Sequence, residues 1–420
     1  MTLLTDTRLR TLALLLAALI VLNAAAARSP NPQRATGRIE VTAWPYFPGS
    51  TIPLRIDGFS PPFQAVLLGP GRIAPGGLYE VPPNPGVGSA LVVAGNEAGL
   101  AATRVRIARP PSTKEGLIVV ASYDDGVIFH RARDFSVLGV LATGGTPGDV
   151  AIDPLGKIAV PDTEGSALTL GTVAPWSVGR IDGVVLGDEV AIDRTTRAVF
   201  VTDRDVNGDG ALTRISVDRS VTRVTTGATA EGLAVDERRQ LVYVANANDG
   251  TVAEVDARSM RVVRKFRAVS RVFSLALSSD GTVLYAISNE STGSLFGAPG
   301  SAVALGLKTP TPRVIARSEN LAFPIGVALD SATQTLFVTD ESTDQIDVLD
   351  ARTLRPKRSP LSTCSTPWKP AFDEVSRRLY VPCAGANEID AFDARTLNRI
   401  ASAPFATGSY PLAVAVWHPK

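Results

Sequence analysis

One segment of the chain has the residue spacing of a calcium-binding loop. Residues 203–210 read Asp-Arg-Asp-Val-Asn-Gly-Asp-Gly, which matches the start of the pattern D-x-[DN]-x-[DN]-G. Alternate oxygen ligands in such a loop converge on a hard cation, and Gly208 permits the sharp bend. The ligands would be Asp203, Asp205, Asn207 and, through its carbonyl, Asp209. Arg214 stands where the bidentate Glu belongs, so we predict a weak, structural Ca²⁺ site. The alternative is a hairpin turn rich in Asp, Asn and Gly.

Other catalytic chemistry has little support in the sequence. Only two histidines occur, His130 and His418, which disfavours copper, haem or iron sites built from several imidazoles. The chain contains no C-x-x-C-H, G-x-S-x-G or P-loop motif. The net charge is +1, with no basic domain or arm, so nucleic acid is not an expected partner.

An internal repeat defines the elements that must position these residues. Segments such as Glu231-Gly-Leu-Ala-Val-Asp236 recur at intervals of 40 to 52 residues. They share the alanines Ala151, Ala191, Ala234, Ala276, Ala328, Ala371 and Ala415. A run of β-branched and aromatic residues follows nearly every copy and ends in a polar turn former, as in Val242–Asn246. This spacing is typical of a β-propeller built from four-stranded blades, in which the small alanine suits the crowded innermost strand.

The two ends of the repeat region complete each other. Leu117–Ala121 resembles a second strand, but no first strand precedes it. Leu412–Trp417 is a first strand with nothing after it. Joining the two gives a composite blade and leaves no open sheet edge. We therefore predict an all-β, seven-bladed β-propeller over residues 113–420, closed by pairing the last strand with the first.

The second strands carry a recurring motif. It reads Tyr243-Val-Ala-Asn246, Phe200-Val-Thr-Asp203, Phe337-Val-Thr-Asp340 and Tyr380-Val-Pro-Cys383. The motif resembles that of the YVTN family of β-propellers, and the resemblance covers about residues 113–420. It implies the fold and leaves the activity open, because propellers host many unrelated functions.

The N-terminal residues 1–27 have the features of a secretory signal peptide. Arg8 and Arg10 precede the apolar run Thr11–Leu22, and small residues at Ala25–Ala27 provide a cleavage site. The alternative is a retained membrane anchor, for which this run is short, since a spanning helix needs about 20 residues. We predict cleavage after Ala27, a secreted or periplasmic protein, and no membrane contact after cleavage.

Residues 28–109 precede the repeats. Residues 28–36 are predicted to be a flexible N-terminus, and Pro110–Thr113 a linker. Short alternating runs between Pro and Gly clusters predict a small immunoglobulin-like β-sandwich over residues 37–109. The alternative is an irregular β extension packed on the propeller.

Charge is distributed unevenly between the two ends of the predicted propeller. The loops from second to third strands contain thirteen acids and one base, Arg204. The acids are Asp124, Asp125, Asp162, Glu164, Asp203, Asp205, Asp209, Asp249, Glu290, Asp340, Glu341, Asp344 and Glu388. The segments between blades, expected at the same end, add Arg267, Arg271, Arg317, Lys357 and Arg358. This pattern favours an acidic rim that attracts a cation or a basic partner. The alternative is that Asp is simply a good turn residue.

The two cysteines fall at this same end. Cys364 precedes the first strand of a blade and Cys383 ends the neighbouring second strand. The antiparallel arrangement brings them close, and export permits a disulfide, so we expect them to be bonded.

Two functions follow from these features. The first is a monomeric binding or scaffold protein that engages an unknown protein or small-molecule ligand on the acidic, loop-rich face. The second is a Ca²⁺-dependent, lactonase-like hydrolase acting at the channel mouth. Its site residues would be Asp149, Asp188, Glu189, Glu231 and Lys369, which also suit an ordinary polar lining where the channel meets water.

Overall fold

The computed structural model describes residues 37–58, 64–96, 99–112, 114–204, 209–289 and 300–419. The chain forms two compact units, Met1–Arg109 and Pro110–Lys420. All regular elements in the described ranges are β-strands, so this part of the chain has no helix that could cross a membrane. The predicted signal peptide and the N-terminal segment 28–36 lie outside the described residues.

The described residues of the first unit form three small antiparallel sheets. They are β1 (Arg38–Glu40) with β3 (Arg55–Asp57); β2 (Thr51–Pro53), β6 (Leu78–Glu80) and β5 (Arg72–Ala74); and β4 (Gln64–Leu68), β7 (Ser89–Asn96) and β8 (Gly99–Arg106). Phe47, Ile52 and Tyr79 are completely buried, and the Tyr79 hydroxyl donates a hydrogen bond to the Pro70 carbonyl at 2.8 Å. The unit therefore has its own core, and the immunoglobulin-like assignment stays a prediction.

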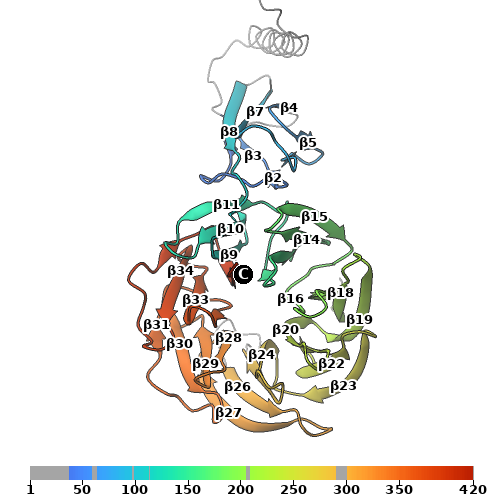
Figure 1. Ribbon diagram of the computed structural model, residues 1–420, viewed down its shortest axis with the longest axis vertical. Coiled ribbons are helices and arrows are strands. Elements are labelled where there is room, and N and C mark those ends of the chain that lie inside the picture. The colour runs from blue at the N-terminus through green and yellow to red at the C-terminus, as the bar shows by residue number, and fades with distance from the viewer. Residues whose placement is uncertain are drawn as a thin grey trace, which may run out of the picture. The chain divides into compact units, whose positions relative to one another are not determined.

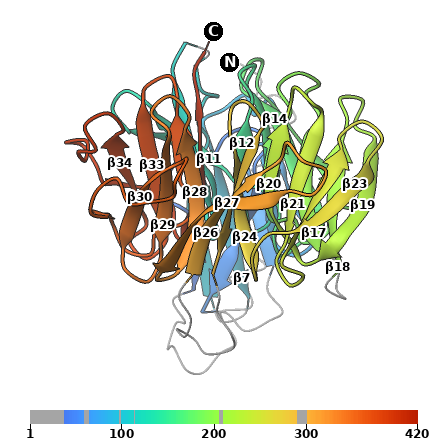
Figure 2. The same ribbon diagram turned by 90° about the horizontal axis from the view of Figure 1, so that it is seen from below.

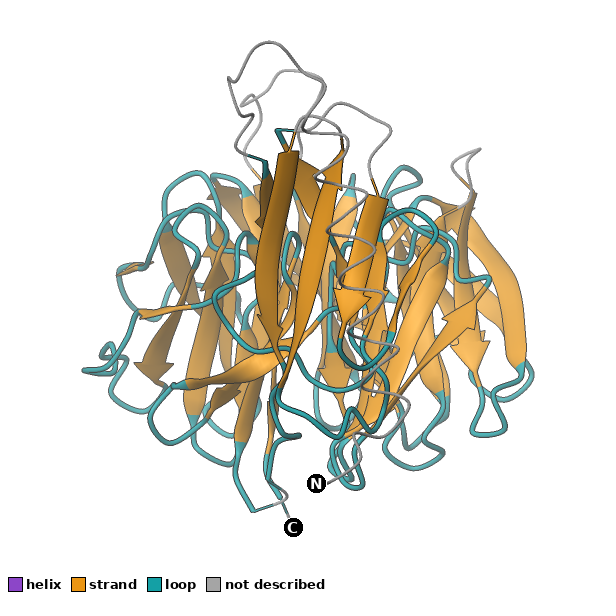
Figure 3. Cartoon of the chain, turned by 90° about the horizontal axis from the view of Figure 1, so that it is seen from above, coloured by secondary structure: helices purple, strands orange, loops and turns teal. Residues whose placement is uncertain are grey.

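The second unit is a ring of four-stranded antiparallel sheets (Figure 1). Its described residues form seven such sheets. In order along the chain they are β9 (Leu117–Ser122), β10 (Gly126–Arg131), β11 (Val137–Leu141) with β36 (Pro411–Trp417); β12 (Ala151–Ile152), β13 (Lys157–Pro161), β14 (Ala167–Thr172), β15 (Ser177–Asp182); β16 (Val190–Ile192), β17 (Val199–Arg204), β18 (Asp209–Ile215), β19 (Val221–Ala228); β20 (Ala230–Asp236), β21 (Leu241–Asn246), β22 (Thr251–Asp256), β23 (Arg261–Arg267); β24 (Val272–Leu277), β25 (Val283–Ser288), β26 (Gly300–Gly306), β27 (Arg313–Leu321); β28 (Pro324–Asp330), β29 (Thr335–Asp340), β30 (Gln345–Asp350), β31 (Leu361–Ser362); and β32 (Ala371–Asp373), β33 (Arg378–Cys383), β34 (Glu388–Asp393), β35 (Phe405–Ala406). Figures 2 and 3 show the loops gathered at the two ends of these strands.

The C-terminal strand closes the ring, as the repeat pattern predicts. β36 pairs antiparallel with β9, and the register runs from Trp417 opposite Leu117 to Pro411 opposite Ser122. Both strands are almost entirely buried. The sheet formed by the first and last strands of the ring has the order β11-β10-β9-β36, so it combines both ends of the second unit.

The aromatic residue of the second-strand motif packs each sheet against the next one. Phe200 of β17 clusters with Val242 and Val244 of β21, and Phe337 of β29 clusters with Leu379 of β33. These side chains are at most 1% exposed. Burying a large apolar side chain contributes about 1.5–3 kcal/mol, so the motif is explained by contacts between sheets.

The aspartate that ends most first strands has two roles. One oxygen accepts the N–H groups of its own turn, as Asp193 does from Thr195 at 2.7 Å. The other oxygen accepts from a side chain of the next sheet: Gln240 donates to Asp193 at 2.8 Å, and Arg197 donates to Asp153 at 2.9 Å. The recurring Asp therefore both stabilises a turn and ties two sheets together.

The innermost strands approach one another so closely that side chains are excluded at particular positions. A Cβ added to Gly232 of β20 would lie 2.7 Å from the carbonyl oxygen of Phe273. One added to Gly326 of β28 would lie 2.8 Å from the Cα of Lys369. The crowding inferred from the repeated alanine is thus found at the glycine two residues before it.

The placement of Lys357 predicted from the sequence is wrong. Its ammonium group donates to the Thr333 carbonyl at 3.0 Å and to the Thr335 hydroxyl at 2.9 Å. These residues belong to the turn between β28 and β29, at the end of the sheets opposite to the acidic loops. β31 is confined to Leu361–Ser362, so Lys357 lies before it, beside the β28–β29 turn.

Candidate functional site

The loops between second and third strands hold much of the acidic rim in place through backbone hydrogen bonds. In each case a loop aspartate accepts an N–H from the segment that leads into a first strand. The pairs are Asp125 with Ser409 (2.6 Å), Asp162 with Thr146 (3.1 Å), Asp249 with Ala228 (2.8 Å), Asp340 with Phe323 (2.9 Å) and Asp344 with Thr366 (2.8 Å). Aspartate therefore recurs in these loops because its carboxylate accepts a backbone N–H group. The recurrence also places these carboxylates together at one end of the ring.

Four of the predicted channel-mouth residues meet at this end. Lys369 precedes β32, and its ammonium group lies 3.1 Å from Glu189 and 3.7 Å from Asp188, which precede β16. Asp149, which precedes β12, accepts the N–H of Val190 at 2.9 Å. Because the sheets of β32 and β16 are separated by two others, Lys369 reaches across the ring.

Burial and charge shift the pKa values in this group, which we call the axial cluster (Asp149, Asp188, Glu189 and Lys369). Burial raises the pKa of Glu189 to about 7; Lys369 opposes the rise, while Asp149 and Asp188 add to it. Burial also raises the pKa of Asp149, again against the effect of Lys369. Burial alone would lower the pKa of Lys369, but the carboxylates Glu189, Asp188 and Asp149 outweigh it and the pKa rises. Lys369 is therefore a fixed cation among the carboxylates.

A threonine of the second-strand motif positions Glu189. The Thr202 hydroxyl accepts the N–H of Glu189 at 2.9 Å and donates to the carbonyl of Glu231 in the next sheet at 2.7 Å. Thr339 repeats this arrangement between Gly326 and Trp368, at 3.1 and 2.8 Å. This role was not predicted from the sequence, although the two Phe-Val-Thr-Asp segments share this threonine.

Glu231 was predicted to belong to the same mouth. It lies in β20 and is 9% exposed. Its backbone carbonyl, which accepts from Thr202, links it to the strand that supports Glu189.

Aromatic and acidic side chains gather at the entrance of the composite sheet. The Tyr410 ring lies 6.1 Å from that of Tyr123, edge to face, and 6.5 Å from that of Trp368. The Tyr123 hydroxyl donates to Glu164, and this hydrogen bond, followed by burial and the nearby charges, raises the pKa of Tyr123 to about 12. We call this group the aromatic–acidic patch; its members are Tyr123, Asp124, Asp125, Glu164, Trp368 and Tyr410.

The predicted calcium loop lies only partly within the described residues. Asp205 and Asn207 fall outside them. The buried Asp203 carboxylate accepts from the Thr213 hydroxyl at 2.8 Å and forms an ion pair with Arg223 at 3.2 Å. Asp209 begins β18 and is exposed. Within the described ranges, no three His, Cys, Asp or Glu residues are grouped so that they could hold a metal ion.

The two cysteines form a disulfide in the structure. Cys364 and Cys383 have a Cα–Cα distance of 5.7 Å, and Cys383 ends β33. The disulfide links the segment before β32 to the last residue of β33. It thus lies at the same end of the sheets as the axial cluster.

Comparisons with known proteins show the fold. No family model matches the chain, and no curated protein matches it. Among solved structures, a functionally unknown protein from Desulfotomaculum acetoxidans is 15% identical, with a TM-score of 0.60 over 72% of this chain and 99% of that one. The periplasmic gluconolactonase of Pseudomonas aeruginosa is 13% identical, with a TM-score of 0.58 over 72% and 98%. A putative 6-phosphogluconolactonase from Bacteroides fragilis is 11% identical, with a TM-score of 0.58 over 73% and 99%. The chain is therefore an all-β protein with a β-propeller fold.

Proposed function

We propose that this protein is an exported, monomeric, seven-bladed β-propeller of the YVTN type that acts as a binding or scaffold protein. Its partner carries basic side chains and docks on the loop-rich end. The observation that carries the proposal is the aromatic–acidic patch. Tyr410 is 41% exposed and packs against Tyr123. The carboxylates of Asp124 and Asp125 accept hydrogen bonds from Ser409, next to Tyr410, and Glu164 accepts one from Tyr123.

The chemistry of the patch suits a lysine or arginine side chain. A cation over an aromatic face gains about 0.5–2 kcal/mol, and neighbouring carboxylates add charge attraction. Tyrosine and tryptophan are also the residues on which binding energy concentrates in protein interfaces. Lys369 occupies the space among the axial carboxylates, so a basic ligand would meet the rim rather than the axis.

Peptide binding tests this proposal. A labelled twelve-residue Lys/Arg-rich peptide and a Glu-rich peptide of equal length are titrated with the protein, and fluorescence anisotropy is measured at two salt concentrations. We expect only the basic peptide to bind, with an affinity that falls as salt rises. Tyr410→Ala should weaken binding about 10-fold, in the range of an interface residue worth ~1–2 kcal/mol.

A matched control separates the patch from overall charge. Asp124→Asn and Asp218→Asn each remove one exposed carboxylate, but Asp218 lies in the turn between β18 and β19, at the other end of the sheets. Only the first change should weaken binding. Equal effects of the two variants, or unchanged binding by Tyr410→Ala, would contradict the proposal.

Hydrolysis of a lactone in the axial cluster is a second candidate function. The observation that favours it is Glu189, whose pKa of about 7 suits a general base near neutral pH. Two of the similar structures belong to a gluconolactonase and a putative phosphogluconolactonase. A Ca²⁺-dependent form would require the ion to displace Lys369 from Asp188 and Glu189, because the ammonium group already contacts both.

A lactone assay distinguishes these forms. Hydrolysis of glucono-lactone is measured with Ca²⁺ and with EDTA, for the unchanged protein and for Glu189→Gln. Activity that EDTA abolishes supports the metal-dependent form, and EDTA-resistant activity lost in Glu189→Gln supports Glu189 as base. The absence of hydrolysis in all conditions rejects the second candidate and leaves the binding proposal standing.

A further inference from the structure

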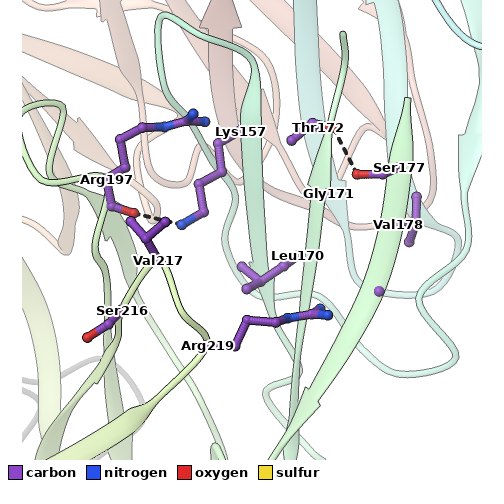
Figure 4. Close-up of a pocket in the computed structure, with 11 residues that line it drawn as sticks. Lys157, Leu170, Gly171, Thr172, Ser177, Val178, Arg197, Ser216, Val217 and Arg219 are labelled. Atoms are coloured by element: carbon purple, nitrogen blue, oxygen red, sulfur yellow. Dashed lines mark hydrogen bonds between the residues drawn. The ribbon is translucent and has the colours of Figure 1, made fainter. Parts of the chain in front are cut away.

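A cavity opens at the end of the ring opposite to the acidic rim. It has a volume of about 330 Å³ and lies between the sheet β12–β15 and the sheet β16–β19. Its principal lining residues are Lys157, Leu170, Thr172, Ser177, Arg197 and Arg219. In the view of Figure 4, Leu170 lies between the ammonium group of Lys157 and the guanidinium group of Arg219.

Positive charge exceeds negative charge in this cavity. Arg197 is paired with Asp153 at 2.9 Å. The Lys157 ammonium donates to the Arg197 carbonyl at 2.7 Å, and neither Lys157 nor Arg219 has a carboxylate within ion-pair distance among the described residues. Of these three cations, only Arg197 therefore has a carboxylate partner among the described residues.

Repulsion among these cations affects Lys157. Burial, followed by the charge of Arg197, lowers the pKa of Lys157; Asp153 opposes this and Arg219 adds to it. A like-charged group held in a partly buried cavity is unfavourable unless an anion compensates for it. The positive charge in the cavity is therefore not fully compensated by the carboxylates of the described residues.

The fold does not require a lysine at this position. Lys157 is the first residue of the second strand, directly after the turn. In the other complete sheets the same position holds Ala198, Leu241, Val283, Thr335 and Arg378. Closing the turn is therefore compatible with small, apolar, polar or charged side chains, so the turn itself does not require a cation there.

The strand opposite leaves room for the second cation. A Cβ added to Gly179 of β15 would lie 2.8 Å from an Nη atom of Arg219, so the guanidinium group rests against a backbone without a side chain. The hydroxyl groups of Thr172 and Ser177 lie 2.8 Å apart on the same wall. Two cations and a pair of hydroxyls thus border one space.

We propose that this cavity binds a phosphate monoester, whose negative charge is compensated by Lys157 and Arg219. Guanidinium and ammonium groups form short, charge-assisted hydrogen bonds to phosphate oxygens. The apolar side chains of Leu170, Val178 and Val217 would contact the organic part of the ligand. A volume of about 330 Å³ is at the lower end for small-molecule sites and fits a small phosphorylated metabolite.

Calorimetric titration at constant ionic strength and pH 7 tests the site. The probes are inorganic phosphate and glycerol 3-phosphate, with acetate for comparison, and the variants are Lys157→Gln and Arg219→Gln. We expect saturable binding of both phosphate compounds to the unchanged protein, at least 10-fold weaker binding in each variant, and weaker binding of acetate. Lys265→Gln, an exposed change on β23, should bind as the unchanged protein does.

Melting temperatures measured in phosphate-free buffer show whether a variant that binds weakly is still folded. Lys157→Gln removes repulsion, so it should melt at or above the temperature of the unchanged protein. Arg219 is exposed, and its variant provides a second test should the first not fold. The proposal is overturned if the unchanged protein shows no saturable binding, or if both variants bind the phosphate compounds as tightly as the unchanged protein does.

Discussion

Replacing Lys369 with methionine should destabilise the ring in a pH-dependent way. The side chain is 13% exposed and faces Glu189 and Asp188, which are 11% and 15% exposed. Removing one partner of a buried ion pair leaves the other charge uncompensated and costs about 3–5 kcal/mol. Because the cluster retains slight exposure, we expect a loss of about 3 kcal/mol at pH 8.

The sign of the pH dependence follows from the raised carboxyl pKa values. Glu189 already has a pKa of about 7, above its ordinary value of 4.5, and Lys369 is the group that holds it down. A group with a raised folded pKa contributes stability that is fully present below the unfolded value and lost as the pH rises through the folded value. Without Lys369 this loss grows, so Lys369→Met should be far less destabilised at pH 5 than at pH 8.

Urea unfolding at both pH values measures the effect. The control is Lys265→Met on β23, which changes the same charge on an exposed outer strand and should shift the free energy of unfolding by less than about 0.5 kcal/mol. A loss below about 1 kcal/mol for Lys369→Met, or equal losses at pH 5 and pH 8, would refute the buried axial cluster.

Three further predictions concern the ring and the calcium loop. Thr202→Val should lower the free energy of unfolding by about 1–2 kcal/mol, because it leaves the Glu189 N–H without its acceptor, whereas Thr202→Ser should stay close to the unchanged protein; equal stability of the valine variant contradicts this role. Deletion of residues 411–420 removes the partner strand of β9 and should abolish cooperative unfolding; a truncated protein with the original melting midpoint would defeat the closure. If residues 203–210 bind Ca²⁺, added Ca²⁺ should raise the melting midpoint and EDTA should lower it. An unchanged midpoint in both conditions would contradict the predicted Ca²⁺ site.

The sequence predicts the strands well where a local pattern repeats. The predicted strands Leu117–Ala121 and Val242–Asn246 lie within β9 and β21. The incomplete blades at the two ends predict the pairing of Leu117 with the C-terminal strand, and β9 and β36 form it. These features depend on the alternation of apolar and polar residues and on where each repeat begins and ends. Both can be read from a single sequence.

Contacts between sheets are harder to predict because they depend on how the repeats face one another. Lys369 and Glu189 could both be placed at the channel mouth, but their ion pair depends on the closed ring. Arg223 lies on an outer strand and neutralises Asp203, which the loop motif alone assigned to a metal. A pattern of residue types does not reveal which carboxylates already have a partner.

Hydrogen–deuterium exchange of the protein with and without the basic peptide tests most directly whether a basic partner binds at the loop-rich end. Binding of the basic peptide should slow exchange in residues 122–126 and 408–411, which carry the exposed part of the aromatic–acidic patch, and should leave the β14–β15 turn at residues 172–177 unchanged. Protection confined to the β14–β15 turn, or no protection at saturating peptide, would contradict binding at the loop-rich end.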